Sequence, residues 1–226
     1  MQPVTGPNGE SYVAFNQQKL ITKEQAKLLK RDKRATVIKK DMDKVGFTIN
    51  RVSPVFDGIN YAALSIFRNQ YELLEKYQTL VNNHKDVMSF INANKEKSAK
   101  ELSEEAKRLD KVLKAQTPKG TEYVPITKKL KQYQIATAQI YAENGRLAAE
   151  LLIQSVRLAA ILRNNFEDII GAEAIAMLLN ANRIAKQSQL TKARLHMSAV
   201  ANEFIDDEKA VIDITKEIQK IIDEKI

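Results

Sequence analysis

The chain has no cysteine and no tryptophan, and its 226 residues include only seven glycines, five prolines and two histidines. The absence of cysteine excludes a disulfide framework, a thiol nucleophile and a cysteine-ligated metal site. Glycine and proline are too scarce for a β protein with many turns. The frequent residues, among them lysine, glutamate, alanine and leucine, favour helix. The composition therefore predicts an all-α fold.

Long apolar runs are also missing. The longest charge-free stretch runs from Gln132 to Ala142 and contains three glutamines and a threonine. A membrane-spanning helix needs about 20 consecutive apolar residues. The first residues, Met1 to Gly6, lack the basic and apolar regions of a signal peptide. We therefore expect a protein that is made in soluble form, and the cytoplasm is its expected location.

The formal net charge of +8 is unevenly distributed along the chain. Residues 1–50 carry a net +5 and residues 95–131 another +5, whereas residues 203–226 carry −4. Two interpretations fit this asymmetry and both stay open. The basic parts meet an anionic partner, or they contact the acidic end of the same chain.

The stretch from Val124 to Ile170 predicts the central helix. Pro125 lies in its first turn, and no further proline interrupts it. At 1.5 Å per residue, such a helix is about 65–70 Å long. Two adjoining apolar stripes make its hydrophobic face too wide for one neighbour, so we expect it to pack between neighbouring helices. The first stripe is Ile126, Leu130, Tyr133, Ile140, Leu147, Leu151, Leu158 and Ile161; the second is Tyr141, Gly145, Ala148, Leu152, Ala159, Leu162 and Phe166.

A seven-residue repeat of inward positions precedes the central helix. This spacing indicates coiled-coil-like packing with a left-handed supercoil. Gln70 and His84 are the strongly polar members, and a polar residue in such a seam can fix the pairing of helices. We therefore interpret Gln70 and His84 as helix-packing specificity residues and not as metal ligands. The repeat comprises Ala35, Ile38, Met42, Val45, Ile49, Val52, Phe56, Ile59, Ala63, Ile66, Gln70, Leu73, Tyr77, Leu80, His84, Val87 and Ile91.

The breaks between these segments predict the organisation of the chain. Residues 1–21 are expected to form an N-terminal arm, with a small hairpin at Asn8-Gly9 as the alternative. Residues 22–226 are expected to form a single domain, an elongated antiparallel bundle of long helices. No sheet of three or more strands is expected anywhere in the chain. Its long connection is expected near 117–125 and a helix break near Gly171.

The strongest interaction signal is the basic segment from Lys19 to Lys44, which carries ten basic and four acidic side chains. Thr22 and Gln25 predict a capping box at the start of its helix. A basic amphipathic helix can lie on an anionic membrane or along a nucleic-acid backbone, and a solvated helix face is the alternative. No aromatic side chain is available here for base stacking. The candidate anionic-surface residues are Lys27, Lys30, Arg31, Lys33, Arg34, Lys39 and Lys40.

Motifs for catalysis or ligand binding are missing. The glycines form no phosphate loop, and neither His84 nor His196 has the spacing of a metal site. The stretch from Asp41 to Gly46 resembles the start of a calcium loop, but Val45 and Val52 occupy ligand positions. We therefore expect no enzyme activity, no catalytic residue, no metal, no cofactor and no small-molecule substrate.

These features lead to one hypothesis with two alternatives. The hypothesis is a non-enzymatic structural protein that forms a homo-oligomer, or pairs with a helical protein partner, and contacts an anionic membrane surface through its basic helix. The alternatives are a sequence-independent nucleic-acid-binding protein and a helical pore-forming or membrane-inserting component. In layout, with long helices, a basic early part and an acidic end, the chain resembles filament-forming membrane-remodelling proteins. Elongated helical pore-forming toxins share the long-helix plan.

Overall fold

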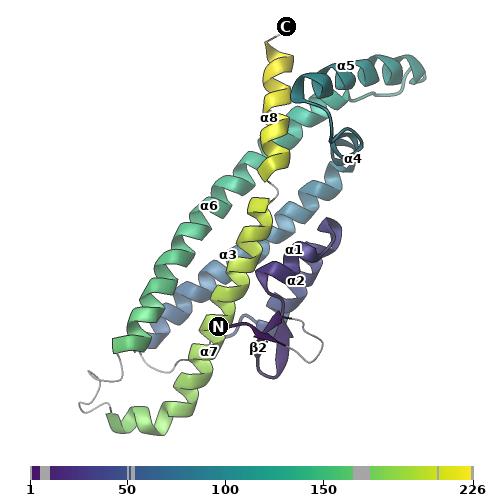
Figure 1. Cartoon of the computed structure of the whole chain (residues 1–226). Coiled ribbons are helices and arrows are strands. Elements are labelled where there is room, and N and C mark those ends of the chain that lie inside the picture. The colour runs from purple at the N-terminus through teal and green to yellow at the C-terminus, as the bar shows by residue number, and fades with distance from the viewer. Residues whose placement is uncertain are drawn as a thin grey trace. The chain divides into compact units, whose positions relative to one another are not determined.

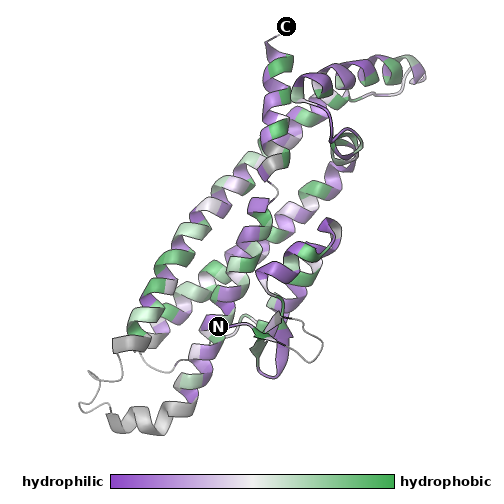
Figure 2. Cartoon of the chain, viewed as in Figure 1, coloured by the Kyte–Doolittle hydropathy of each residue, from purple (hydrophilic) through white to green (hydrophobic). Residues whose placement is uncertain are grey.

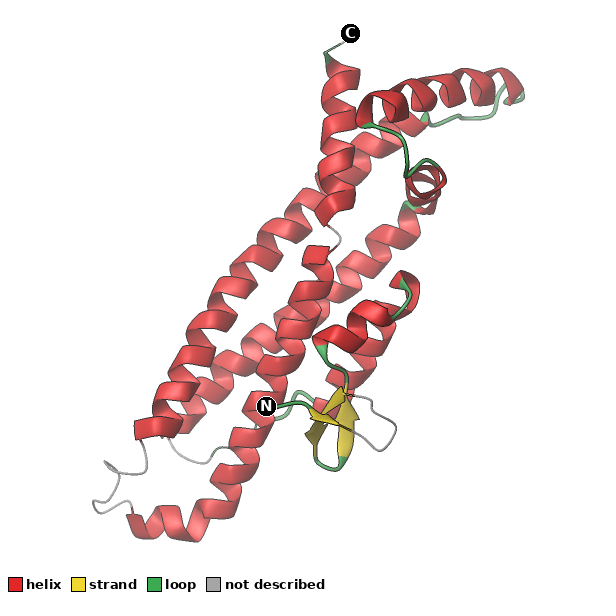
Figure 3. Ribbon diagram, in the orientation of Figure 1, coloured by secondary structure: helices red, strands yellow, loops and turns green. Residues whose placement is uncertain are grey.

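The computed structural model describes residues 2–5, 11–49, 51, 54–164, 174–207 and 209–224. The protein is 79% helical, and its described part contains eight helices and a small N-terminal sheet (Figures 1 and 3). A mostly helical fold is thus confirmed. The chain divides into two compact units. The first comprises residues 1–74 and 144–204, and the second comprises residues 75–143 and 205–226.

The N-terminal sheet shows that the expectation of a fold without a three-stranded sheet was wrong. Strand β1 (Val4–Thr5) pairs antiparallel with β2 (Ser11–Phe15), and β2 pairs antiparallel with β3 (Gln18–Leu20). The turn between β2 and β3 is Asn16-Gln17, with φ angles of 45° and 62°. Positive φ at both central residues is the geometry that two-residue hairpins favour, because its twist matches that of the strands.

Burial explains why this short sheet forms. Val13 and Phe15 on β2 and Leu20 on β3 are all buried, whereas Ala14 between them is exposed. This alternation places one face of the hairpin in the core of the first unit. The sequence signals of glycine and proline that suggested an arm lie just before this hairpin. The alternative turn at Asn8-Gly9 and the break near Gly171 lie outside the described residues.

The long helices follow the predicted periodicity. The central helix is confirmed as α6, and the later part of the seven-residue repeat, from Phe56 to Ile91, runs along α3 and α4. The connection predicted near 117–125 is confirmed between α5 and α6. The helices are α1 (Lys23–Leu28), α2 (Arg31–Val45), α3 (Pro54–Asn83), α4 (Lys85–Ala93), α5 (Ala99–Gln116), α6 (Ile126–Asn164), α7 (Ala174–Asp207) and α8 (Lys209–Asp223).

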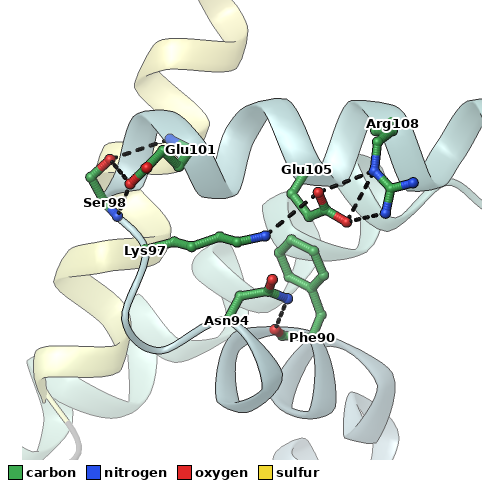
Figure 4. Close-up of polar contacts among 7 residues, drawn as sticks. All are labelled: Phe90, Asn94, Lys97, Ser98, Glu101, Glu105 and Arg108. Atoms are coloured by element: carbon green, nitrogen blue, oxygen red, sulfur yellow. Dashed lines mark hydrogen bonds and ion pairs between the residues drawn. The ribbon is translucent and has the colours of Figure 1, made fainter.

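Local capping sets the helix starts in both units. The predicted capping box at Thr22 is confirmed, because its hydroxyl accepts from the Gln25 amide at 3.2 Å and its own amide donates to the Gln25 side chain at 3.3 Å. In the second unit, Ser98 and Glu101 form the same arrangement at the start of α5 (Figure 4). Two further ion pairs join Glu105 to Lys97 and Arg108 there.

The seven-residue repeat marks the core. Thirteen of its fifteen positions with described burial are buried, and Ile49 and His84 are half-buried. In the first unit, Ile59 and Ala63 of α3 pack with Leu158 of α6 and Leu195 of α7. In the second unit, α5 packs against α8. The helix-packing periodicity read from the sequence therefore corresponds to the buried faces of the helices.

Candidate anionic-surface interface

The basic segment forms two helices and not one. Helix α1 ends at Leu28, and Leu29 and Lys30 adopt extended backbone before α2 begins at Arg31. Gly46, at φ 78°, then ends α2. The bend at Leu29 and Lys30 changes the direction of the backbone between α1 and α2. The basic side chains of the two helices are buried to different extents.

The seven candidate residues divide into an exposed and a half-buried group. Lys27, Lys30, Lys33 and Lys40 are exposed, whereas Arg31, Arg34 and Lys39 are half-buried. We call Lys30, Lys33 and Lys40 the lysine stripe. Lys33 and Lys40 lie seven residues apart and share a face of α2, and Lys30 borders that face three residues earlier. In the described part of the chain, none of these three lysines has an ion-pair partner.

The half-buried cations contribute to the packing of the first unit. The Arg34 guanidinium donates to the Lys27 carbonyl oxygen at 3.0 Å and lies 5.6 Å from the ring centre of Phe204 on α7. The Lys39 ammonium lies 4.6 Å from the ring centre of Tyr71 on α3. Cation–π contacts of this kind stabilise by about 0.5–2 kcal/mol. These side chains hold α2 in place, and they are less available to a surface than the lysine stripe.

Two lysines of α1 contact the acidic end of the chain. The Glu203 carboxylate on α7 lies 2.7 Å from the Lys23 ammonium and 2.6 Å from the Lys27 ammonium. Hydrogen bonds from these two ammonium groups lower the pKa of Glu203. The intramolecular alternative raised by the charge asymmetry therefore applies to Lys23 and Lys27. Among the described residues, no such ion pair involves the lysine stripe.

Ile21 anchors the start of α1 from two sides. Its amide donates to Asp41 Oδ2 of α2 at 2.6 Å, and its carbonyl oxygen lies 3.0 Å from His196 Nε2 of α7. Asp41 is buried, and it also forms an ion pair with Lys44. Sequence reasoning missed both anchors, because their partner is a backbone group that leaves no trace in residue spacing. The anchors fix the orientation of α1.

Leu28 adds an apolar side chain to the basic surface. It is 87% exposed, next to Lys27 in sequence and two residues before Lys30. It is the last residue of α1, so the break that follows carries it away from the core. Figure 2 shows both hydrophilic and hydrophobic residues along α1 and α2, and the hydrophilic ones are the majority in the sequence of both helices. Leucine and lysine side chains are both common on helices that lie on anionic bilayers.

The two packing candidates occupy different environments. Gln70 is buried on α3, and its amide nitrogen donates to Asn144 Oδ1 of α6 at 2.8 Å. His84 lies in the second unit between α3 and α4, and its ring lies edge-on to Tyr133 at a centroid distance of 5.6 Å. Gln70 therefore joins two helices by a hydrogen bond, and His84 contacts its neighbour through an aromatic ring.

His196 gives the anchor of α1 a pH dependence. Burial, with a smaller contribution from Lys23, lowers the pKa of His196 below 6.5. His196 therefore takes up a proton more readily in the unfolded chain than in the folded chain. As a result, the unfolding free energy falls as the pH drops below about 6.5. We expect His196→Gln to remove part of the stability loss between pH 7.5 and 5.5, measured by urea denaturation. An equal loss in both proteins would contradict this assignment.

Comparisons with known proteins provide no relative for this site. No protein-family model, no curated protein and no solved structure matches the chain. Within the described ranges, no group of three or more histidine, aspartate or glutamate side chains is placed to hold a metal ion. The same residues include no helix that is long and apolar enough to span a bilayer.

Proposed function

We propose that this chain is a non-enzymatic structural protein that self-associates and lies on an anionic membrane surface through α1 and α2. The observation that carries the proposal is the exposed lysine stripe together with the exposed Leu28, which lies two residues before Lys30 in the sequence. Lysine side chains near an anionic bilayer contribute about 1 kcal/mol each at most. A buried leucine adds about 1.5–3 kcal/mol where it leaves water.

Leu28 supports a lipid surface over a nucleic acid. Both surfaces attract lysines, and both attractions weaken with salt. A phosphate backbone has no apolar phase to receive a leucine side chain, whereas the boundary between headgroups and acyl chains does. Leu28→Ser should therefore weaken liposome binding and leave any binding to DNA nearly unchanged.

Neutralising the lysine stripe tests the proposal. At half the maximal contribution, three lysines supply about 1.5 kcal/mol, which is roughly tenfold in affinity. We expect the triple variant Lys30→Gln, Lys33→Gln, Lys40→Gln to bind anionic liposomes about tenfold more weakly at low salt, with unchanged helix content. Flotation with phosphatidylserine vesicles measures the affinity, and circular dichroism measures the helix content.

A matched variant separates the effect of the lysine stripe on liposome binding from the effect of net charge. Lys111, Lys114 and Lys119 are exposed lysines of the second unit, and changing all three to glutamine removes the same charge. This control should bind nearly as well as the wild type. Equal losses in both triple variants would mean that the stripe is no specific site. A wild type that ignores anionic lipid but binds DNA with a steep salt slope would support the nucleic-acid alternative.

Self-association is proposed through coiled-coil-like contacts of the long helices. The burial of the seven-residue repeat supports such packing within the chain, and a second apolar stripe of α6 remains for contacts between chains. The pore-forming or membrane-inserting alternative differs in one measurable outcome. It requires leakage of vesicle contents at the protein concentrations that give binding, whereas surface attachment does not.

A further inference from the structure

Two arginine side chains from different helices of the first unit hold the turn that follows α2. Arg194 of α7 donates to the carbonyl oxygen of Gly46 at 2.9 and 3.2 Å and to that of Thr48 at 2.6 Å. Arg68 of α3 donates to the carbonyl oxygen of Phe47, between them, at 3.1 Å. Three successive carbonyl groups thus bring two guanidinium groups together. We call Arg68, Arg194 and residues 46–48 the arginine clamp.

The arginine clamp has two positive charges and no carboxylate partner in the described part of the chain. No ion pair there includes Arg68 or Arg194. The Arg68 charge contributes, after burial, to a lowered pKa of Arg194, because the two cations repel each other. A buried charge is costly unless an opposite charge or hydrogen bonds compensate it.

The hydrogen bonds of Arg194 compensate its charge only in part. Its side chain is fully buried, and its Nε and Nη2 atoms donate to the turn. The Nη1 atom is also buried and has no hydrogen-bond partner among the described residues. A guanidinium carries two N–H donors on this atom. One negative ion beside Nη1 would accept from it and would also reduce the repulsion between the two cations.

The surroundings of the clamp restrict the size of such an ion. The ring of Phe47 packs against Phe67 and Tyr71, with centroid distances of 5.0 and 5.2 Å. These rings lower the local dielectric constant, which strengthens the attraction between opposite charges. Arg68 is exposed, so the clamp borders solvent. A lipid phosphate or a carboxylate of another protein is too bulky to reach the fully buried Arg194, whereas a single-atom ion is not.

From the unpartnered donor, the two uncompensated cations and the lack of space for a larger group, we infer that the arginine clamp binds a halide ion, chloride in the cell. Nη1 of Arg194 donates to the ion, and Arg68 supplies the second positive charge. The ion stabilises the turn after α2. This inference does not rest on membrane contact, and its tests use no lipid.

Thermal unfolding in two salts tests the inference on the full chain. Sodium chloride replaces sodium gluconate at constant ionic strength, so that the screening of the other charges stays the same. If about 150 mM chloride exceeds the dissociation constant roughly tenfold, the thermal midpoint should rise by roughly 3–5 °C and approach saturation. Equal midpoints in chloride and gluconate would overturn the halide site.

Variants of the exposed arginine locate the effect without endangering the fold. Arg68→Gln should at least halve the chloride-dependent rise, and Arg68→Lys, which keeps the charge, should retain most of it. Arg157→Gln removes the same charge at an exposed position of α6 and should respond to chloride as the wild type does. Equal chloride responses of Arg68→Gln and Arg157→Gln would place the ion elsewhere and overturn the inference.

Arg194→Gln should lose the chloride response entirely if the variant folds. A direct measurement covers the case in which it does not. Crystals of the wild-type protein grown with bromide in place of chloride should show anomalous scattering beside Nη1 of Arg194. Anomalous scattering only at other positions would contradict the site, even if chloride raises the thermal midpoint.

Discussion

Asn144→Leu is expected to lower the unfolding free energy by about 3 kcal/mol. Asn144 is fully buried on α6 and connects three helices of the first unit. Its Oδ1 accepts from Gln70 of α3 at 2.8 Å, and its Nδ2 donates to the Asn202 carbonyl oxygen of α7 at 3.0 Å. The Asn202 side chain returns a hydrogen bond to the Asn144 carbonyl oxygen at 2.9 Å. Leucine would leave the first two partners unsatisfied in the core.

The loss of unfolding free energy should depend on whether Gln70, the hydrogen-bond partner of Asn144, is still present. An unpaired buried polar group costs about 1–3 kcal/mol, whereas removing both partners of a hydrogen bond can be nearly neutral. Gln70→Leu combined with Asn144→Leu should therefore destabilise less than the sum of the single changes. Asn83→Leu, at an exposed position of α3, should change the unfolding free energy by less than about 0.5 kcal/mol. Urea denaturation measures all four proteins, and strict additivity would contradict the proposed network.

The hydrogen bonds among Gln70, Asn144 and Asn202 show what the periodicity of the sequence can and cannot predict. The seven-residue repeat predicted that Gln70 points inward and sets helix pairing, because its spacing matches the apolar positions around it. Its partner lies 74 residues further along the chain. Periodicity assigns a residue to a face of its own helix and does not indicate which residue of another helix lies opposite. Asn144 could be suspected only once the two helices were aligned.

The break between α1 and α2 could not be predicted from the sequence, because tertiary contacts cause it. Leu29 and Lys30 are ordinary helix formers, and nothing in their local sequence ends a helix. The anchors of Ile21 fix α1, while the buried face of α2 fixes that helix, and the chain between them must bend. Tertiary contacts therefore overrode local propensity at this point, and the single basic helix expected from the sequence became two.

The candidate site was predictable in outline. Charge density located the basic segment, and amphipathic spacing indicated which residues face the core. Which cations remain available depends on residues from distant parts of the chain, such as Phe204 beside Arg34 and Glu203 beside Lys27. The exposure of Leu28 likewise follows from the end of α1 and not from its place in an apolar pattern.

Arg194→Ala is expected to lower the unfolding free energy by about 3 kcal/mol. Arg194 on α7 is fully buried, and it donates to the Gly46 carbonyl oxygen at 3.2 and 2.9 Å and to the Thr48 carbonyl oxygen at 2.6 Å. These bonds hold the turn that follows α2. Alanine would leave both carbonyl oxygens without a donor and would open a cavity the size of the lost side chain.

The charge on Arg194 limits the size of this effect. Burial, with a smaller contribution from Arg68, lowers the pKa of Arg194 to about 10. The guanidinium is therefore still charged at neutral pH, but its burial costs unfolding free energy at neutral pH, and this cost disappears only as the pH rises above about 10. Alanine removes that cost along with the hydrogen bonds, so the net loss is smaller than three bonds and a cavity would suggest.

Arg68 supplies the matched control for Arg194. It is exposed on α3 and donates to the Phe47 carbonyl oxygen of the same turn at 3.1 Å. Because water can replace an exposed donor, Arg68→Ala should cost less than about 1 kcal/mol. Hydrogen exchange should report faster opening of residues 46–49 in Arg194→Ala and little change in Arg68→Ala. Equal effects of the two substitutions on unfolding and exchange would refute a special role for the buried guanidinium.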